Sequence, residues 1–247
     1  MKKSTLDKFP LLKEIPEEKF PNHVLIIPDG NARFAKLIHN VPLIGHRKGA
    51  QVLKTVLRTL QDLPIRIVTI WGFATDNWKR SKQEVEGLMV IFKEALDEVL
   101  PELLQNKSRF IHLGRKDRIP QYLKKAIEQV EDLTKTNNNK ILCIAIDFGG
   151  EDQTFRIMQA VRNLPKDSEI NLDVLRKLRD GHGEIPPADL IIRTSGEQRT
   201  SDIGWLAQNS EFYSIKKLLP QTRIEDFVKA IIDYSKRQRR FGGRPHE

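Results

Sequence analysis

The sequence predicts an α/β fold, a mainly parallel six-stranded sheet covered by helices on both faces. Short apolar runs rich in β-branched residues alternate with longer segments whose apolar residues recur at helical spacing. This alternation is typical of parallel sheets, which are buried between helices. Because no linker, repeat or low-complexity tract interrupts the 247 residues, we expect a single domain over residues 22–247, preceded by an N-terminal arm over residues 1–21.

The elements are expected in a regular order. The arm combines three prolines with mixed charge, and we expect a short, loosely packed leader. Strands are expected over residues 23–28, 65–73, 109–113, 141–146, 189–193 and 211–214. Helices are expected over residues 46–62, 81–104 and 118–136, from the turn at 147–150 to residue 164, near 171–180, and from residue 222 onward.

Three residues are expected to cap these helices. Ser81 with Glu84, and Thr222 with Glu225, match the capping-box pattern of a hydroxyl residue followed three positions later by a glutamate. Asp147 follows an apolar strand, and its simplest role is to cap the next helix.

Composition limits the classes of partner and compartment. The net charge is +9 and the pI about 9.6, which favours anionic partners such as phosphates, nucleic acid or an anionic membrane surface. The single cysteine, Cys143, excludes an internal disulfide and suits a reducing compartment. No apolar stretch reaches the ~18 residues of a membrane span, and the N-terminus lacks a secretory apolar region. We therefore expect a cytoplasmic protein, with peripheral membrane contact left open.

Four polar clusters follow strand ends, over residues 29–33, 75–80, 147–150 and 193–201. The carboxyl ends of parallel strands lie at one edge of a sheet, where ligands bind, so these clusters are expected to share one site. The cations expected there are Arg33, Lys36, His46, Arg47, Arg80, Arg193 and Arg199. The neutral donors are Asn31, Asn77, Thr194, Ser195 and Ser201, and the acids are Asp29 and Glu211.

This inventory predicts a site for more than one phosphate group and one divalent cation. Arginine offers a fork of donors that matches phosphate oxygens, and Mg²⁺ prefers one or two carboxylates together with substrate oxygens. Each residue also has a purely structural interpretation. Asp29 could belong to a capped turn, Trp78 to the core, and Glu197 to an ion pair with a neighbouring arginine. The coincidence of four mostly cationic clusters favours the functional interpretation.

Six motifs in order then resemble the cis-prenyltransferases, the undecaprenyl diphosphate synthase family, from about residue 22 to 243. The motif Asp29-Gly30-Asn31-Ala32-Arg33-Phe34-Ala35-Lys36 resembles D-G-N-G-R-W-A-K, and Gly45-His46-Arg47-Lys48-Gly49 matches G-H-x-x-G. The motif Asn77-Trp78-Lys79-Arg80-Ser81 is similar to N-W-x-R-P, and residues 192–199 are similar to I-R-T-S/G-G-E-x-R. Residues 210–213 match S/A-E-x-Y, and residues 239–243 match R-R-F-G-G.

The resemblance implies a homodimeric, Mg²⁺-dependent transferase that condenses isopentenyl diphosphate with an allylic diphosphate and leaves a cis double bond. It implies that Asp29 is catalytic and acts with the metal, that Glu211 helps hold the metal, and that Asn77 is catalytic near the reacting carbons. The positions implied to bind substrates are Gly30, Asn31, Arg33, Phe34 and His46 on the allylic side, Trp78 and Arg80 near the reacting carbons, and Arg193, Arg199 and Ser201 on the isopentenyl side. The apolar face of the 81–104 helix would line a tunnel for the hydrocarbon tail, although an ordinary core fits the same pattern.

The chain departs from the family pattern, mainly on the allylic side. Ala32 replaces a glycine, Pro42 falls where an arginine is common, and Ala74 replaces a serine. Asp147-Phe148 replaces asparagine-tyrosine. These changes suggest an unusual allylic substrate or product length, so a short-chain or irregular synthase joining two dimethylallyl units is the first alternative.

Two further alternatives come from other classes. A non-catalytic partner subunit of a prenyltransferase would usually lack the metal aspartate and the arginines, which this chain retains. A nucleic-acid-binding protein is suggested only by net charge. Its cations lie at strand ends and in the tail, at Lys236, Arg237, Arg239, Arg240 and Arg244, with little aromatic interleaving, so no nucleic-acid partner is expected.

Overall fold

The computed structural model describes residues 5–243. Residues 1–4 of the expected arm and residues 244–247 of the expected domain, Arg244 among them, lie outside the described residues.

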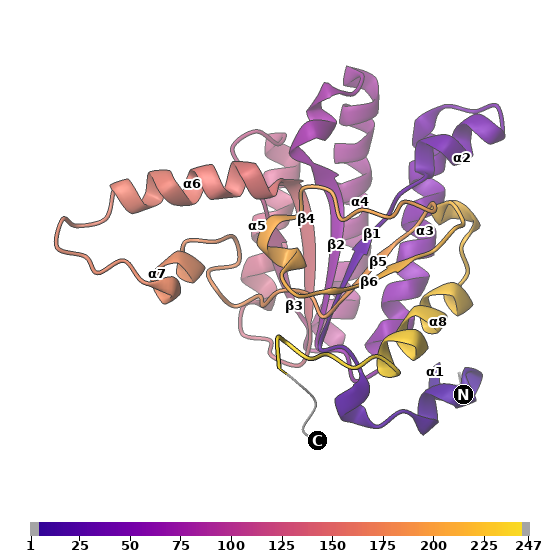
Figure 1. Cartoon of the computed structure of the whole chain (residues 1–247). Coiled ribbons are helices and arrows are strands. Elements are labelled where there is room, and N and C mark those ends of the chain that lie inside the picture. The colour runs from indigo at the N-terminus through magenta and orange to yellow at the C-terminus, as the bar shows by residue number, and fades with distance from the viewer. Residues whose placement is uncertain (1–4, 244–247) are drawn as a thin grey trace.

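One six-stranded sheet forms the centre of the molecule (Figure 1). Its order is β3-β4-β2-β1-β5-β6, and every neighbouring pair is parallel, as the sequence predicts. The strands are β1 His23–Ile27, β2 Ile67–Ala74, β3 Arg109–Leu113, β4 Ile141–Phe148, β5 Leu190–Arg193 and β6 Glu211–Ser214. All six expected strands are therefore confirmed, with β4 extending two residues further than predicted.

The helices lie close to their expected positions. They are α1 Thr5–Lys8, α2 Asn31–Leu37, α3 Pro42–Gln61, α4 Lys82–Gln105, α5 Gln121–Thr134, α6 Gly150–Arg162, α7 Leu172–Lys177 and α8 Ile224–Ser235. Short 3-10 turns add η1 Pro10–Glu14, η2 Glu17–Lys19, η3 Thr75–Lys79, η4 Gly204–Ala207 and η5 Leu219–Gln221. Helix α3 begins four residues before its expected start because Pro42 occupies the first turn, where its fixed φ and missing N–H cost nothing.

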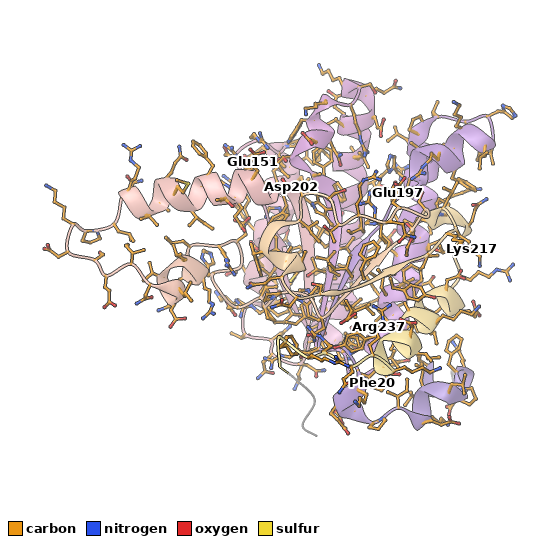
Figure 2. All side chains as sticks on the ribbon, in the orientation of Figure 1. Phe20, Glu151, Glu197, Asp202, Lys217 and Arg237 are labelled. Carbon is orange, nitrogen blue, oxygen red and sulfur yellow. The ribbon has the colours of Figure 1, made fainter. Side chains whose placement is uncertain are left out.

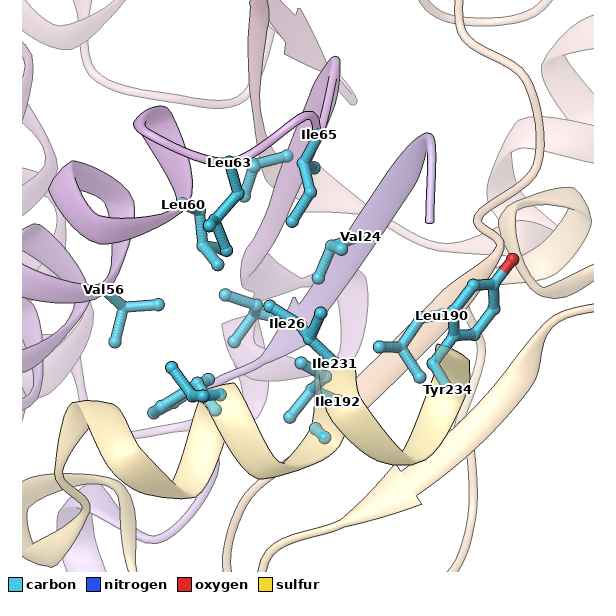
Figure 3. Packing of buried hydrophobic residues seen from close by; sticks show 14 of the residues in the cluster. Val24, Ile26, Val56, Leu60, Leu63, Ile65, Leu190, Ile192, Ile231 and Tyr234 are labelled. Atoms are coloured by element: carbon cyan, nitrogen blue, oxygen red, sulfur yellow. The ribbon is translucent and has the colours of Figure 1, made fainter. Parts of the chain in front are cut away.

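The core lies on both faces of the sheet. On one face, α3 and α8 pack on β1, β2 and β5 (Figure 3), and α4 and α5 pack on β2, β3 and β4. On the other face, η4 and the segment that precedes β5 cover the sheet through Ile185, Ala188, Ile203 and Leu206. Helices α6 and α7 extend sideways from the body (Figure 1). Among residues 5–243, no helix combines the length and apolar character needed to cross a membrane.

The arm is packed firmly, so the expectation of a loose leader is wrong. Leu12 is 1% exposed and Phe20 is 8% exposed, and both belong to the cluster under α3 and α8. The Thr5 hydroxyl donates to the carboxylate of Asp62 at the end of α3 (2.7 Å). The apolar residues between the charges of this segment are what anchor it.

The expected caps have mixed outcomes. The Ser81 hydroxyl accepts from the Glu84 N–H, so this cap of α4 is confirmed. Thr222 instead donates to the carbonyl of Leu219, and the prediction that it caps the last helix is wrong. Asp147 does not cap α6 either, because the backbone N–H of Glu151 donates to Asp202 (Figure 2 labels both).

Candidate active site

Asp29 follows β1 at the carboxyl edge of the sheet. Its backbone is fixed by Thr194, the residue after β5. The Asp29 N–H donates to Thr194 Oγ1 (2.8 Å), and the Thr194 hydroxyl donates to the Asp29 carbonyl (2.7 Å). Because β1 and β5 are paired in register through Ile27 and Arg193, the two clusters that follow them meet as predicted.

Arg193 joins this aspartate to the isopentenyl-side cluster. Its guanidinium is buried and donates to Asp29 Oδ2 (2.9 Å), to the Ser201 hydroxyl (2.8 Å) and to the Arg199 carbonyl (2.6 Å). A buried arginine that binds both Asp29 and the 199–201 loop holds the two halves of the site together.

A second arginine extends the network towards solvent. Arg33, half exposed on α2, donates to Asp29 Oδ1 (3.2 Å) and to Glu197 (3.0 Å), and Glu197 also pairs with Arg199. The structural interpretation of Glu197, an ion pair with neighbouring arginines, is therefore confirmed. Arg33 and Arg199 are both paired with acids of the same chain.

Charge at Asp29 is set by these partners. Burial on its own raises the pKa of Asp29, but the hydrogen bonds and charges of Arg193 and Arg33 outweigh burial and hold the pKa below its ordinary value. The carboxylate is thus ionised at neutral pH, as a ligand for a divalent cation must be.

Close helix packing places Asn31 at the same edge. A Cβ on Gly45 would lie 2.0 Å from the Asn31 carbonyl oxygen, and a Cβ on Gly49 would lie 2.2 Å from Asn31 Oδ1. Only glycine therefore allows α3 to approach the start of α2 this closely. Gly30, with a φ of +100°, forms the turn between Asp29 and α2.

Several buried polar atoms at this edge lack a hydrogen-bond partner among the described residues. They are Asn31 Oδ1, Arg193 Nε, Ser195 Oγ and Ser214 Oγ. Buried polar atoms are normally paired, so unpaired ones at a strand edge indicate a place where a ligand or ordered water binds.

His46 and Arg80 share an acid that the sequence interpretation treated only as a capping residue. Glu84 Oε1 lies 3.1 Å from His46 Nε2 and accepts from Arg80 (3.1 Å). Burial lowers the pKa of His46 more than Glu84 raises it, and the charge of Arg80 lowers it further. The spacing of four residues between Arg80 and Glu84 at the start of a helix could have predicted the Arg80–Glu84 pair, but not the contact with His46.

The η3 turn is fixed from both sides. Asn77 Oδ1 accepts from the Ala74 N–H (3.1 Å), so this side chain closes its own turn. The Trp78 indole N–H donates to Asp147 Oδ1 (2.8 Å), and its ring packs edge-on against Phe73 with 5.2 Å between centroids. The interpretation of Trp78 as a packing residue is confirmed by these contacts.

Asp147 is the residue whose role the sequence missed. Its carboxylate is fully buried, its φ is +56°, and Arg118 donates to it from Nε (2.7 Å) and from a second nitrogen. The carboxylate therefore links η3, through Trp78, to the segment that precedes α5.

Three other candidates lie away from this cluster. Lys36 and Phe34 are on α2, where Lys48 lies 5.0 Å from the Phe34 ring centroid. Arg47 is on α3 and pairs with Glu94 on α4 (2.6 Å).

Glu211 lies at the amino ends of the strands, whereas Asp29 lies at their carboxyl ends. The expectation that Glu211 joins Asp29 at one metal site therefore does not hold within one chain. Glu211 is the first residue of β6. It pairs with Leu190 of β5, which in turn pairs with Val24 of β1, and Val24 is about 10 Å along the strand from Ile27, the last residue of β1. Its carboxylate accepts from Arg237 (2.8 Å). Figure 2 shows Arg237 towards the lower end of the sheet and Glu197 near the upper end.

An apolar cavity of about 450 Å³ opens beside Asn31 and His46. It lies between α3 and α4 over the sheet, and its apolar walls include Leu53, Ile70, Leu88, Phe92 and Ile144. Leu88 and Phe92 of the predicted face of α4 line this cavity, whereas Met89, Leu96 and Leu103 of the same face are buried in the core, so the predicted tunnel lining and the ordinary-core alternative each hold for part of the helix. Ion pairs between α3 and α4 form its outer wall: Arg47–Glu94, Lys54–Glu98 and Arg58–Glu102.

Comparison with known proteins identifies the family. A family model described as "Putative undecaprenyl diphosphate synthase" matches residues 27–242. The chain belongs to the undecaprenyl diphosphate synthase family of cis-prenyltransferases. The resemblance inferred from the six motifs is therefore confirmed, and the chain is a prenyl-transferring enzyme of this family.

Relatives of this cis-prenyltransferase include enzymes of different product type. It is 40% identical over 235 residues to an isoprenyl transferase of Thermotoga maritima, covering 91% of this chain and 98% of the relative. It is 36% identical to a tritrans,polycis-undecaprenyl-diphosphate synthase (geranylgeranyl-diphosphate specific) of Methanocaldococcus jannaschii, covering 94% and 86%. Lavandulyl diphosphate synthase from Lavandula x intermedia, solved with dimethylallyl diphosphate, superposes with a TM-score of 0.85 at 31% identity, covering 91% of this chain and 99% of that one.

Proposed function

We propose that this cis-prenyltransferase condenses isopentenyl diphosphate with an allylic diphosphate and extends a hydrocarbon tail into the α3–α4 cavity. The observation that carries the proposal is the position of the cavity mouth, because Asn31 and His46 line both the cavity and the cationic edge that holds Asp29. A molecule with a diphosphate head and an apolar tail matches that pair of environments.

The cationic and neutral donors of the site would bind the diphosphate groups of the two substrates. Condensation breaks the allylic carbon–oxygen bond, forms a carbon–carbon bond to isopentenyl diphosphate, and releases diphosphate and one proton. Arg33 and Arg199 are half or more exposed and paired only with acids, so they can turn to diphosphate oxygens. Donors fixed before the reaction stabilise the charge that builds on the leaving group. The buried Arg193 and the exposed Ser201, which it contacts, are proposed to hold the isopentenyl diphosphate.

The allylic side would be held by the start of α2 and by α3. Gly30 and Asn31 bring backbone and amide donors to the edge, and His46 lies beside the cavity mouth. Asn77, Trp78 and Arg80 are proposed to lie near the reacting carbons, because η3 follows β2 at the same edge. Phe34 is proposed as a substrate contact on α2.

Mg²⁺ is the proposed cofactor, and the residues present fit it. Asp29 supplies one ionised carboxylate beside several cations, and Mg²⁺ is commonly held by one or two carboxylates together with substrate phosphates. The described residues hold no cluster of three or more acidic, histidine or cysteine ligands, which is consistent with a metal that arrives with substrate. When bound, the metal would neutralise charge on the departing diphosphate.

A homodimer would complete the site. Because Glu211 and Asp29 lie at opposite edges, Glu211 can help a metal held by Asp29 only across two copies of the chain. The projecting α6–α7 region offers an apolar contact surface, with Phe155, Met158 and Leu172 each more than half exposed. We expect light scattering to give twice the chain mass, and a Phe155→Ser, Met158→Ser variant to give the single mass; a monomeric wild-type protein at full activity would contradict this.

An irregular or short-chain reaction is the second candidate. The likeness to lavandulyl diphosphate synthase, solved with dimethylallyl diphosphate, favours it, as do Ala32, Pro42 and Ala74 on the allylic side. The volume of the apolar cavity, about 450 Å³, favours a longer tail. A non-catalytic partner subunit is disfavoured because Asp29, Arg193 and Arg199 form a connected network.

Product sizing tests the proposal. Purified protein is incubated with Mg²⁺, radiolabelled isopentenyl diphosphate and either dimethylallyl, geranyl or farnesyl diphosphate, and the labelled products are separated by length. We expect incorporation of label into an extended prenyl diphosphate with at least one acceptor. Unlabelled products formed from dimethylallyl diphosphate alone would support the irregular reaction. The lack of any product from every combination would contradict both the regular and the irregular reaction.

A further inference from the structure

The corner between α2 and α3 exposes three aliphatic side chains that the rest of residues 5–243 leaves largely or partly open to solvent. Leu37 is 64% exposed, Ile38 40% and Val41 57%, all within five residues of one turn. In Figure 1 this corner stands at the upper right, clear of the sheet. Single exposed aliphatic residues are ordinary on a protein surface, whereas three neighbouring ones at a projecting corner mark an interaction site.

Several backbone groups of the corner are paired within the turn. The N–H of His39 donates to the Lys36 carbonyl (3.1 Å), the N–H of Asn40 donates to the Ala35 carbonyl (2.9 Å), and His39 takes a φ of +51°. This arrangement closes the end of α2 and pairs the carbonyls of Ala35 and Lys36. The Val41 N–H is bound by the Asn40 side chain (2.9 Å). The turn can therefore enter an apolar medium without leaving these groups unpaired.

Charge around the corner favours an anionic partner. Between Asp29 and Asp62 the chain has six lysines and arginines and no acidic residue. Several of these cations form ion pairs with acids outside this segment. Arg33 pairs with Asp29 and with Glu197, and Arg47 pairs with Glu94. Lys36 and Lys48 are exposed on either side of the aliphatic turn.

The corner also adjoins the mouth of the apolar cavity. Helix α3 begins at Pro42, directly after Val41, and one turn later His46 and Arg47 line the cavity. A surface that binds lipid at the corner would hold the cavity mouth close to that lipid, where an apolar product has its most favourable environment.

We propose that the α2–α3 corner docks on an anionic lipid bilayer, with Leu37, Ile38 and Val41 inserted between the headgroups and Lys36 and Lys48 at the headgroup level. Aliphatic residues and cations in this combination are what peripheral membrane contacts use. The proposal stands on the surface alone, and its test measures lipid binding rather than turnover, so it fails or survives independently of the proposed reaction.

Vesicle co-sedimentation tests it. The full-length protein is mixed with vesicles of phosphatidylcholine, or of phosphatidylcholine with phosphatidylglycerol, at low and at physiological salt. We expect binding to the phosphatidylglycerol vesicles only, weakening with salt. A Leu37→Ser, Ile38→Ser, Val41→Ser variant should bind about tenfold or more weakly for each side chain lost. A Lys36→Gln variant should bind about fivefold more weakly at low salt.

The matched control is Leu104→Ser with Leu133→Ser, which removes two similarly exposed leucines from α4 and α5. This control should bind vesicles like the wild type. A Val41→Trp variant gives a second readout, since brominated lipid should quench its fluorescence. Equal vesicle binding by the triple variant and the wild type, or no binding by the wild type, would overturn the proposal. So would loss of oligomeric mass in the triple variant, which would assign the corner to a second copy of the chain.

Discussion

Removal of either partner of the buried Asp147–Arg118 pair should have unequal effects on stability. Asp147 is fully buried, whereas the Arg118 side chain is 37% exposed. Arg118→Gln leaves a buried carboxylate without its cation, which costs about 3–5 kcal/mol of unfolding free energy. Asp147→Asn keeps an acceptor for Trp78, tolerates the positive φ, and leaves a cation that water can reach. Its cost should be the loss of charge-assisted hydrogen bonding, about 1–3 kcal/mol.

The assay is urea unfolding of the wild type, both single variants and the double variant at neutral pH. The double variant should be more stable than Arg118→Gln alone, because the amide no longer needs a charged partner. An equal loss of unfolding free energy in Asp147→Asn and Arg118→Gln, or a loss in the double variant equal to the sum of the two single losses, would contradict this prediction.

Three further predictions concern stability. His23 and His112 are buried with their pKa values lowered by burial to about 4, so the unfolded state binds more protons below pH 6.5 and stability falls as pH drops from 6.5 towards 4. Each should cost about 2 kcal/mol at pH 5, measured by urea unfolding, and a flat profile in the wild type would contradict this. Leu12→Ala should cost about 2–5 kcal/mol if the arm is anchored, whereas an unchanged melting curve would show that it is not. Gly45→Ala should sharply lower the melting temperature, because its Cβ would meet the Asn31 carbonyl at 2.0 Å; a wild-type melting temperature would show that α2 moves freely.

The sequence was most informative where local chemistry and topology agree. Apolar strands followed by polar clusters predicted both the parallel sheet and the meeting of Asp29 with Arg193, because all strand ends of a parallel sheet face one edge. The same logic could have placed Glu211, which begins its strand rather than follows it. The prediction that Glu211 lies beside Asp29 relied on its motif and not on its position at the start of a strand.

Other features depend on contacts that sequence patterns do not encode. The partnership of Glu84 with His46 joins residues 38 positions apart on different helices. Asp147 binds Trp78 and Arg118 because β4 runs two residues further than its apolar run and carries the carboxylate inward. The cavity between α3 and α4 is lined in part by residues of the ion pairs that join the two helices, and no spacing rule distinguishes such a gap from a filled core.

The Asp29 network at the cavity mouth is proposed as the catalytic centre for prenyl transfer. The most direct measurement is the rate of labelled isopentenyl incorporation by Asp29→Ala, compared with Asp97→Ala, an exposed acid on α4 that pairs with Lys93. Asp29→Ala should lose at least about a hundredfold in rate, as when a group that stabilises developing charge is removed, and Asp97→Ala should match the wild type. An Asp29→Ala enzyme within a few-fold of the wild-type rate would contradict the account.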